Sequence, residues 1–156
     1  MITFFMDHPN PILTPTKQPQ IRVITLGLIK TSTHLLVSSG YDSVKQQAFY
    51  RALGGGVEFG EAGRDALRRE FQEEIQAELT NIQYLGCIEN RFVYEDKSGH
   101  ELVLLYQCDL ADPQFYQQEV ISGYEGDQML TAHWVEIERF KSGELLLVPE
   151  ECLQYL

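Results

Sequence analysis

Most apolar residues of this chain fall into short runs that have the length of a β-strand. Such runs, rich in Val, Ile, Leu, Phe and Tyr and bounded by polar residues or glycine, are typical of strands joined by turns. Six of them predict strands over residues 21–30, 35–38, 49–53, 82–94, 101–110 and 131–137. We expect the first two to pair as a hairpin, and 82–94 and 101–110 to form a second hairpin about residues 97–99. Residues 40–42 are predicted to be a loop.

One stretch, around residue 70, has the period of an α-helix. Leu67, Phe71 and Ile75 recur every four residues and form a stripe that we expect to pack against the sheet. Gln76 stands where the helix would end in a left-handed residue, at a cost of about 1 kcal/mol relative to glycine. A short helix is predicted over 150–156. Strands before and after one long helix predict an α/β fold, an α/β/α sandwich with a mixed β-sheet.

The chain divides into a short arm and one domain. Its 156 residues suit a single hydrophobic core. Residues 1–20 are predicted to be an extended, proline-rich N-terminal arm, and residues 21–156 the single domain. The prolines of the arm are Pro9, Pro11, Pro15 and Pro19.

The predicted helix carries three carboxylates on one face, Glu70, Glu73 and Glu74. Residues three and four apart are neighbours on a helix surface, so each like-charge pair costs about 0.2–0.5 kcal/mol. A hard divalent cation such as Mg²⁺ or Mn²⁺, which prefers oxygen ligands, would offset that repulsion. Arg69 lies four residues before Glu73, and ion pairing from this position would hold the cluster in register.

A run of glycines, residues 54–56, precedes the helix as a predicted turn. Because glycine has no Cβ, the carbonyl of Gly54 or Gly55 can approach a metal ion held by the carboxylates. We therefore expect the metal ligands to be the helix glutamates together with one of these two carbonyl oxygens.

The spacing of these residues is specific. Five residues separate Gly55 from Glu61, seven separate Glu61 from Arg69, and the glutamates follow directly. This pattern resembles the signature of the Nudix hydrolases, the MutT-like family, G-x5-E-x7-R-E-U-x-E-E-x-G-U with U a bulky apolar residue. The departures are Gln76 in place of the last glycine and Ala77 at the last apolar position.

The resemblance implies the Nudix fold and metal-assisted hydrolysis of a diphosphate that joins a nucleoside to another group X. It implies catalytic roles for Glu70, Glu73 and Glu74 as ligands of Mg²⁺ or Mn²⁺, with Arg69 in the motif. It also implies that Glu61 supports the site from just outside the ligand shell. Because clustered acids titrate as a coupled set, the general base stays open.

In many members of that family an acid from a later loop completes the site. Glu125 is our candidate for this role, because Gly123 and Gly126 flank it in a predicted loop and long loops tend to carry function. Asp127 and Glu119 are the next candidates. A solvated loop acid without function is the competing interpretation.

Candidates for substrate binding are less sharply marked. Arg51 and Arg22 would meet phosphates and Tyr50 would stack on a base, although arginines and aromatics on strands are more often packing residues. For His100 and Glu101 we favour a structural role over metal binding, since no second nitrogen ligand stands at a useful spacing.

The charge of the chain limits its partners. It has 23 acidic and 12 basic residues, a formal net charge of −11, which disfavours binding to duplex nucleic acid. We expect a small-molecule nucleoside diphosphate derivative as the substrate. A homodimer remains an alternative to the monomer.

The odd number of cysteines, Cys87, Cys108 and Cys152, indicates free thiols in a reducing compartment, by default the cytoplasm. The apolar residues at the start of the chain are too few for a signal peptide, and no apolar run approaches about 20 residues. Neither secretion nor membrane spanning is expected.

Two alternatives to hydrolysis stay open. A noncatalytic nucleotide or nucleotide-sugar sensor on the same fold would be expected to lose site carboxylates, which are present here. Isomerisation of an allylic diphosphate would use an added cysteine and glutamate, but Cys87 lies in a predicted strand and outside a recognisable isomerase motif.

Overall fold

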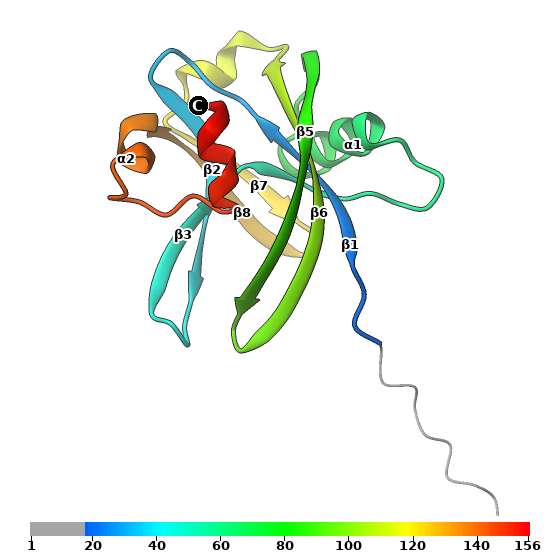
Figure 1. Cartoon of the computed structure of the whole chain (residues 1–156). Helices are drawn as coiled ribbons and strands as arrows, with labels where there is room; N and C mark the ends of the chain where they lie inside the picture. The colour runs from blue at the N-terminus through cyan, green and yellow to red at the C-terminus, as the bar shows by residue number, and fades with distance from the viewer. Residues whose placement is uncertain (1–17) are drawn as a thin grey trace, which may run out of the picture.

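The computed structural model describes residues 18–156. Within them, eight strands form the body of the fold (Figure 1): β1 (Arg22–Leu28), β2 (His34–Asp42), β3 (Gln47–Arg51), β4 (Leu53–Gly56), β5 (Leu79–Tyr94), β6 (Lys97–Leu110), β7 (Val120–Glu125) and β8 (Gln128–Glu136). The helices are α1 (Gly63–Ile75) and α2 (Ile137–Lys141), with 3-10 helices η1 (Pro113–Gln117) and η2 (Glu150–Tyr155). The predicted arm falls almost entirely on residues outside this description, and its boundary at residue 20 stays a prediction.

The strands form two four-stranded sheets. The first has the order β4-β1-β6-β5 and is mixed, because β1 runs parallel to β6 whereas β4 and β5 are antiparallel to their neighbours. The second has the order β3-β2-β8-β7 and is entirely antiparallel. The mixed sheet expected from the sequence is confirmed.

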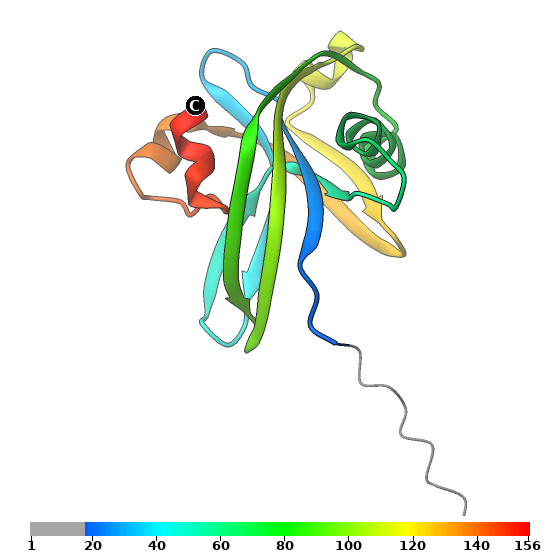
Figure 2. The same ribbon diagram turned by 45° about the vertical axis from the view of Figure 1, so that its right-hand side comes forward.

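Helices cover the strands on opposite sides, α1 on one side and α2 with η2 on the other (Figure 2). This arrangement confirms the α/β/α class. Two apolar clusters fill the interior: one joins β1 residues such as Ile24 and Leu26 to Phe140 of α2. The other packs Leu67 and Phe71 of α1 against Leu36 of β2.

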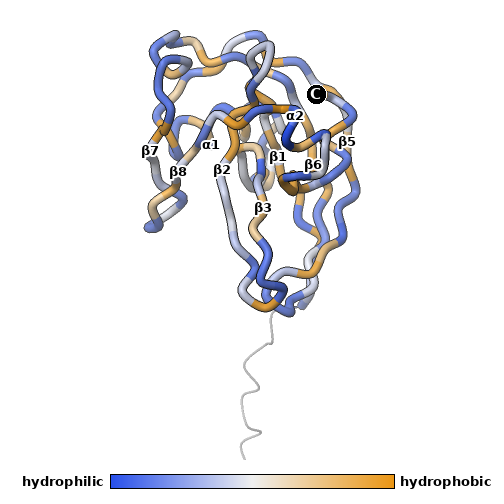
Figure 3. The backbone as a smooth tube through the Cα atoms, turned by 90° about the vertical axis from the view of Figure 1, so that its left-hand side faces the viewer, coloured by the Kyte–Doolittle hydropathy of each residue, from blue (hydrophilic) through white to orange (hydrophobic). Residues whose placement is uncertain are grey.

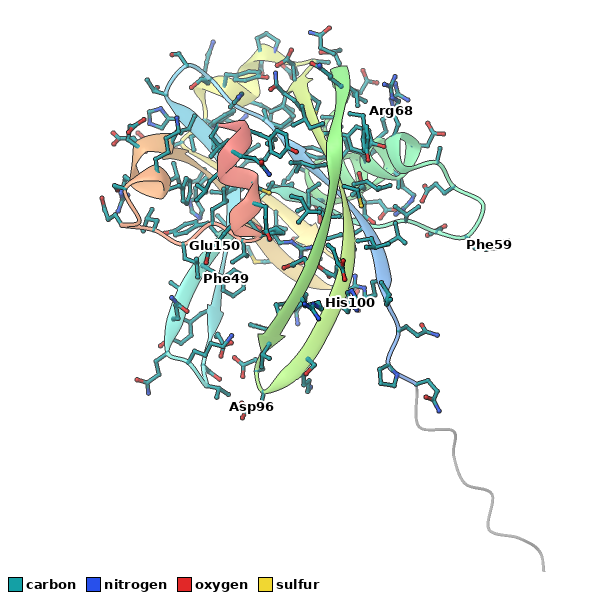
Figure 4. The ribbon with its side chains drawn as sticks, viewed as in Figure 1. Phe49, Phe59, Arg68, Asp96, His100 and Glu150 are labelled. Carbon is teal, nitrogen blue, oxygen red and sulfur yellow. The ribbon has the colours of Figure 1, made fainter. Side chains whose placement is uncertain are left out.

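The stripe predicted on α1 is buried as expected, since Leu67 and Phe71 are fully buried and Ile75 is nearly so. Arg68 points away from the strands into solvent (Figure 4). The helix ends at Gln76, which has a φ of 55° in the left-handed region. Gln76 therefore bears the strain that the sequence predicted for a side chain at this place.

The first predicted hairpin is wrong. β1 and β2 lie in different sheets and meet only near their connection, where Lys30 bridges Leu35 and the Leu36 N–H donates to the Ile29 carbonyl. Leu28 and Ile29 are consecutive and both buried, one in each apolar cluster. The chain thus passes from one sheet to the other, and β1 pairs instead with the distant β4 and β6.

Other boundaries differ from the prediction. Residues 40–42 continue β2 and pair with β3. Residues 49–53 span the end of β3 and the start of β4, which belong to different sheets. The second hairpin is confirmed, but it turns at Glu95 and Asp96, whose φ angles are 50° and 58°, and residues 97–99 already belong to β6.

Four elements were not predicted or were predicted as another type. η1 and β7 occupy parts of the expected loop before residue 131, and α2 follows β8 directly where a strand was expected to end. The predicted C-terminal helix is a 3-10 helix, η2. No helix in residues 18–156 has the length and apolarity needed to cross a bilayer.

The β2–β3 and β5–β6 hairpins project from the same end of the molecule (Figures 1 and 3), with Asp96 at the tip of the latter (Figure 4). Glu95 accepts hydrogen bonds from the Ser43 N–H and hydroxyl. The rings of Phe49 and Tyr94 meet edge to face at 5.8 Å. The two sheets are therefore joined at these tips as well as through the core.

Candidate active site

Glycines bring β4 against both β1 and α1. They do not form a turn, as the sequence predicted, but belong to a strand in which Gly54 pairs with Leu26 and Gly55 with Thr25. Gly54 has a φ of +144°, and a Cβ on it would overlap the Thr25 carbonyl. A Cβ on Gly55 would lie 2.5 Å from both Glu70 carboxylate oxygens. The absence of side chains here lets the Glu70 carboxyl group rest on the β4 backbone.

The three helix glutamates differ in exposure. Glu73 is 59% exposed and Glu70 only 15%. Glu74 is buried, and its Oε2 atom has no hydrogen-bond partner. Burial raises the pKa of Glu74 to about 8, helped by the charges of Glu70 and Glu125, while Gly54 and Arg51 act in the opposite direction. Burial likewise raises the pKa of Glu70, opposed by Arg69.

Arg69 contacts several acids of the cluster at once. Its guanidinium donates to Glu61 at 2.8 Å, to the Gly56 carbonyl at 2.8 Å and to Glu70 at 3.0 Å. It also reaches Glu73 at 3.4 Å, the ion pair expected four residues apart. The Arg69 hydrogen bond, followed by that of the Glu58 N–H, lowers the pKa of Glu61 to about 2. Arg69 thereby links α1 to β4 and to the segment between them.

The donors fit a hard divalent cation. A buried carboxylate oxygen without a partner, on Glu74, is costly unless something binds it, and carboxylate oxygens are ligands that a hard cation prefers. Gly55 leaves the space beside the Glu70 carboxylate open that a Cβ would fill, and we call this open backbone position the Gly55 cradle. Within residues 18–156, no group of three His, Cys, Asp or Glu side chains is already arranged to hold a metal ion.

Glu125 comes from the end of β7 and not from a loop, which corrects the sequence-based expectation. Pairing of β7 with β8 ends at Glu125 and Gln128, around Gly126 and Asp127. A Cβ on Gly123 would overlap the Glu74 carbonyl, so β7 passes directly against the end of α1. The charge of Glu125 acts on both Glu70 and Glu74, so the structure brings Glu125 to the cluster.

The other two acids proposed near Glu125 differ in position. Asp127 lies in the turn between β7 and β8. Glu119 precedes β7, at the opposite end of the strand from Glu125. Six residues of strand span roughly 20 Å, so Glu119 is displaced from the cluster.

The residues proposed for substrate binding lie on strands of different sheets, Arg22 on β1 and Tyr50 and Arg51 on β3. Arg22 and Arg51 are both ion-paired with Glu101, at 3.6 and 3.5 Å. Tyr50 packs edge to face on Phe140 at 5.7 Å and belongs to the apolar core, so stacking on a base is not its present contact. His100 contacts Glu89 at 3.1 Å, in line with the structural role expected for it.

Glu101 is the residue whose role the sequence did not reveal. It is buried and holds two arginines from different sheets. The sequence does carry a signal for this role. Glu101, Val103 and Leu105 alternate along one strand and so share its core-facing side, where an acid needs a polar or charged partner.

The family model described as NUDIX domain matches residues 19–155. Among characterised proteins, the NAD-capped RNA hydrolase NudC of Pseudomonas syringae pv. tomato is 32% identical over 82 residues, which cover 53% of this chain and 27% of that protein. A NudC of Pseudomonas fluorescens is 32% identical over 88 residues, with 27% of its length matched. The chain therefore spans about a quarter of the length of the curated relatives it matches.

Solved structures share the fold. A NUDIX hydrolase from Nitrosomonas europaea has a TM-score of 0.59 at 14% identity, covering 86% of this chain and 85% of that one. A MutT NUDIX hydrolase from Burkholderia pseudomallei has a TM-score of 0.57 at 17% identity, covering 76% and 85%. These likenesses support the architecture described above.

Proposed function

The chain belongs to the NUDIX domain family, and from this premise we propose that it is a metal-dependent pyrophosphohydrolase. Its substrate would be a nucleoside diphosphate linked to another group X, cleaved within the diphosphate. The observation that carries the proposal is the buried Glu74 Oε2 without a partner, beside Glu70 and the Gly55 cradle. An acidic cluster built in this way is costly to the fold, and binding of a divalent cation would offset the cost.

Glu70, Glu73, Glu74 and the carbonyl of Gly54 or Gly55 would hold Mg²⁺ or Mn²⁺. When bound, the ion neutralises charge on phosphate oxygens and lowers the pKa of a coordinated water. Arg69 keeps Glu70 and Glu73 oriented and ties them to Glu61.

In the hydrolysis, a water oxygen attacks phosphorus, the anhydride P–O bond breaks, and a carboxylate oxygen takes the proton released by the water. The charge of Glu125 acts on both Glu70 and Glu74, and we assign the proton to these carboxylates together and not to one of them. Glu125 is proposed as the acid that comes from outside the helix.

The X group is the open part of the proposal. The NAD-capped RNA hydrolases matched above favour dinucleotides such as NAD among the substrates to be tried. We propose that Arg51 and Arg22 meet the phosphates and that Tyr50 borders the site. The net charge of −11 supports reception of an anionic substrate through the metal and these local arginines, and not through a general basic surface.

Cellular location, macromolecular partners and oligomeric state are also part of the proposal. We propose that the protein works in the cytoplasm, without duplex nucleic acid or membrane as a partner. The homodimer stays an alternative to the monomer, and size-exclusion chromatography with light scattering distinguishes the two.

A substrate screen tests the function. The parent protein and Glu73→Gln are assayed with Mg²⁺ or Mn²⁺ on nucleoside triphosphates, nucleotide sugars, NAD, dinucleoside polyphosphates and ADP-ribose, and nucleotide products are separated by chromatography. Glu73 is chosen because it is well exposed, so the variant should fold normally. Glu138→Gln, on α2 in the opposite layer and 84% exposed, is the matched control.

We expect at least one substrate to be cleaved by the parent and the control, with turnover reduced by about 100-fold or more in Glu73→Gln, because a charged ligand is lost. Equal turnover in all three proteins would contradict the metal-helix mechanism. Binding of a nucleotide without any cleavage would favour the sensor alternative.

A further inference from the structure

Three carboxylates are buried among residues 18–156: Glu74, Asp42 and Glu101. Glu74 belongs to the site described above. Asp42 is satisfied by backbone N–H groups, those of Val44, Lys45 and Glu95, and it also pairs with the Lys45 side chain at 3.5 Å. Glu101 differs from both, because its charged partners are two arginine side chains from separate elements.

Glu101 connects the two sheets. Its Oε1 lies 3.6 Å from Arg22 on β1, within the same sheet, and its Oε2 lies 3.5 Å from Arg51 on β3, in the other sheet. The carboxylate side chain is 4% exposed, whereas that of Arg51 is 33% exposed and that of Arg22 is 65% exposed. Each arginine is thus paired with a buried carboxylate while part of its side chain is exposed to solvent.

Arg51 is close to the glycines of β4 along the chain, and Arg22 is close to them through the pairing of β1 with β4. Arg51 precedes Gly54 by three residues, and its charge acts on Glu74. Arg22 lies two residues before Ile24, which pairs with Gly56. Arg22 and Glu101 also line an open pocket of about 860 Å³ between the start of β1 and the β5–β6 hairpin.

A buried acid in this position has a cost. An apolar residue would continue the core face formed with Val103 and Leu105, and a buried ion pair seldom stabilises a fold more than such a residue does. The contacts of 3.5 and 3.6 Å are also longer than tight charge-assisted hydrogen bonds, which measure about 2.7–2.9 Å. Glu101 orients the two arginines but does not use all of their N–H donors.

We propose that Glu101 is a positioning residue that holds the Arg51 and Arg22 guanidinium groups ready for the diphosphate of the substrate. The inference rests on the proposed function of the same site. Arginine suits this task because its planar donors match phosphate oxygens in pairs, and prior orientation reduces the entropy lost on binding.

The test is a double-mutant cycle read by binding and by kinetics. Inorganic pyrophosphate with Mg²⁺ is titrated calorimetrically into the parent, Glu101→Gln, Arg51→Gln and the double variant, each first shown to fold by circular dichroism and thermal melting. We expect Glu101→Gln to weaken binding about tenfold and Arg51→Gln to weaken it at least as much. The double variant should lose less affinity than the sum of the two single losses, because part of the effect of Glu101 passes through Arg51.

In steady-state kinetics on a cleaved substrate, KM should rise by about the same factor as the pyrophosphate Kd, while kcat changes less than about threefold. The reason is that the misoriented arginines bind the phosphates more weakly in the ground state and in the transition state alike. Glu101→Asp, which keeps the charge, should restore part of the affinity, and it replaces Glu101→Gln in the cycle if that variant fails to fold. Asp42→Asn is the control for a buried carboxylate with only structural partners; it should lower the melting temperature and leave pyrophosphate affinity unchanged.

Parent-like pyrophosphate affinity in folded Glu101→Gln, or losses that simply add in the double variant, would overturn the inference. Failure of the parent to bind pyrophosphate would overturn it as well. Failure of the proposed function is distinguishable, because it appears as no cleavage in the substrate screen whatever the pyrophosphate titrations give.

Discussion

The Glu70 carboxyl group rests on the backbone of Gly55, so that a Cβ at residue 55 would lie 2.5 Å from both of its oxygens. The overlapping atoms belong to the far end of a flexible side chain. A substitution here would therefore move Glu70 away from Arg69 and the cluster while leaving the core of the fold in place. The relationship connects a backbone position on β4 with a proposed metal ligand on α1.

From this contact we predict that Gly55→Ala reduces turnover about tenfold or more, with the melting temperature lowered by only a few degrees. Gly56→Ala is the matched control, since no atom lies within 4 Å of a Cβ built there. Steady-state kinetics and thermal melts of both variants check this. Equal activity of the two variants would show that the cradle is not needed.

Binding of a divalent metal should stabilise the fold. Millimolar Mg²⁺ or Mn²⁺ is expected to raise the melting temperature, by an amount equivalent to about 2.7 kcal/mol at 100 times Kd. Glu74→Gln should melt higher than the parent in EDTA, because it removes a buried carboxylate flanked by like charges, yet gain less from metal. A parent without any metal-dependent shift in a thermal scan would count against the ligand set.

Glu125 should contribute to turnover from β7. Glu125→Gln is expected to lower kcat at least about tenfold, the low end for a positioned general base. Asp127→Asn should act more weakly, and Glu119→Gln least, because Glu119 lies at the other end of β7. If Asp127→Asn or Glu119→Gln proved the damaging change instead, the acid was chosen wrongly; if all three were active, the helix cluster works without it.

Acid should weaken the fold through Glu61. The pKa of Glu61 is lowered to about 2 from its usual 4.5 by Arg69, so its stabilising effect is complete above pH 4.5 and is lost as pH falls toward 2. Glu61→Gln should therefore be less stable than the parent at pH 7, with the difference shrinking between pH 4.5 and 2. Urea unfolding at a series of pH values measures it, and a difference independent of pH would contradict the assignment.

Gln76 offers a test of helix termination. Its φ of 55° is unfavourable for a residue with a Cβ, so Gln76→Gly should stabilise the protein by about 1 kcal/mol. Gln72→Gly, an exposed position inside the same helix, should destabilise it by about 1 kcal/mol. Denaturant unfolding of the two variants should give opposite signs.

Local spacing by itself determined the chemistry of α1. Because a helix turns 100° per residue, Glu70, Glu73 and Glu74 share a face in any helix that includes them, and Arg69 reaches Glu73 for the same reason. The buried stripe with Phe71 followed from the same periodicity, whereas the strained end at Gln76 was expected from the glycine that the family signature has at this place. None of these relationships depends on where the rest of the chain lies.

Only the tertiary structure decided which strands are neighbours. An alternating pattern shows that a strand has a buried face, but not which partner covers its edge, since pairing depends on the free energy of the whole core. For this reason β1 was expected beside β2, yet it lies between β4 and β6. The glycines of β4, expected as a turn, are strand residues for the same reason.

The residues added to the site by non-local pairing follow the same logic. Glu125 reaches the cluster because β7 pairs with β8 and passes against the end of α1 at Gly123. Glu101 meets Arg22 and Arg51 because β1, β3 and β6, far apart in sequence, come together at the junction of two sheets. Sequence distance carries no information on such contacts, whereas three or four residues along a helix fix the distance between side chains directly.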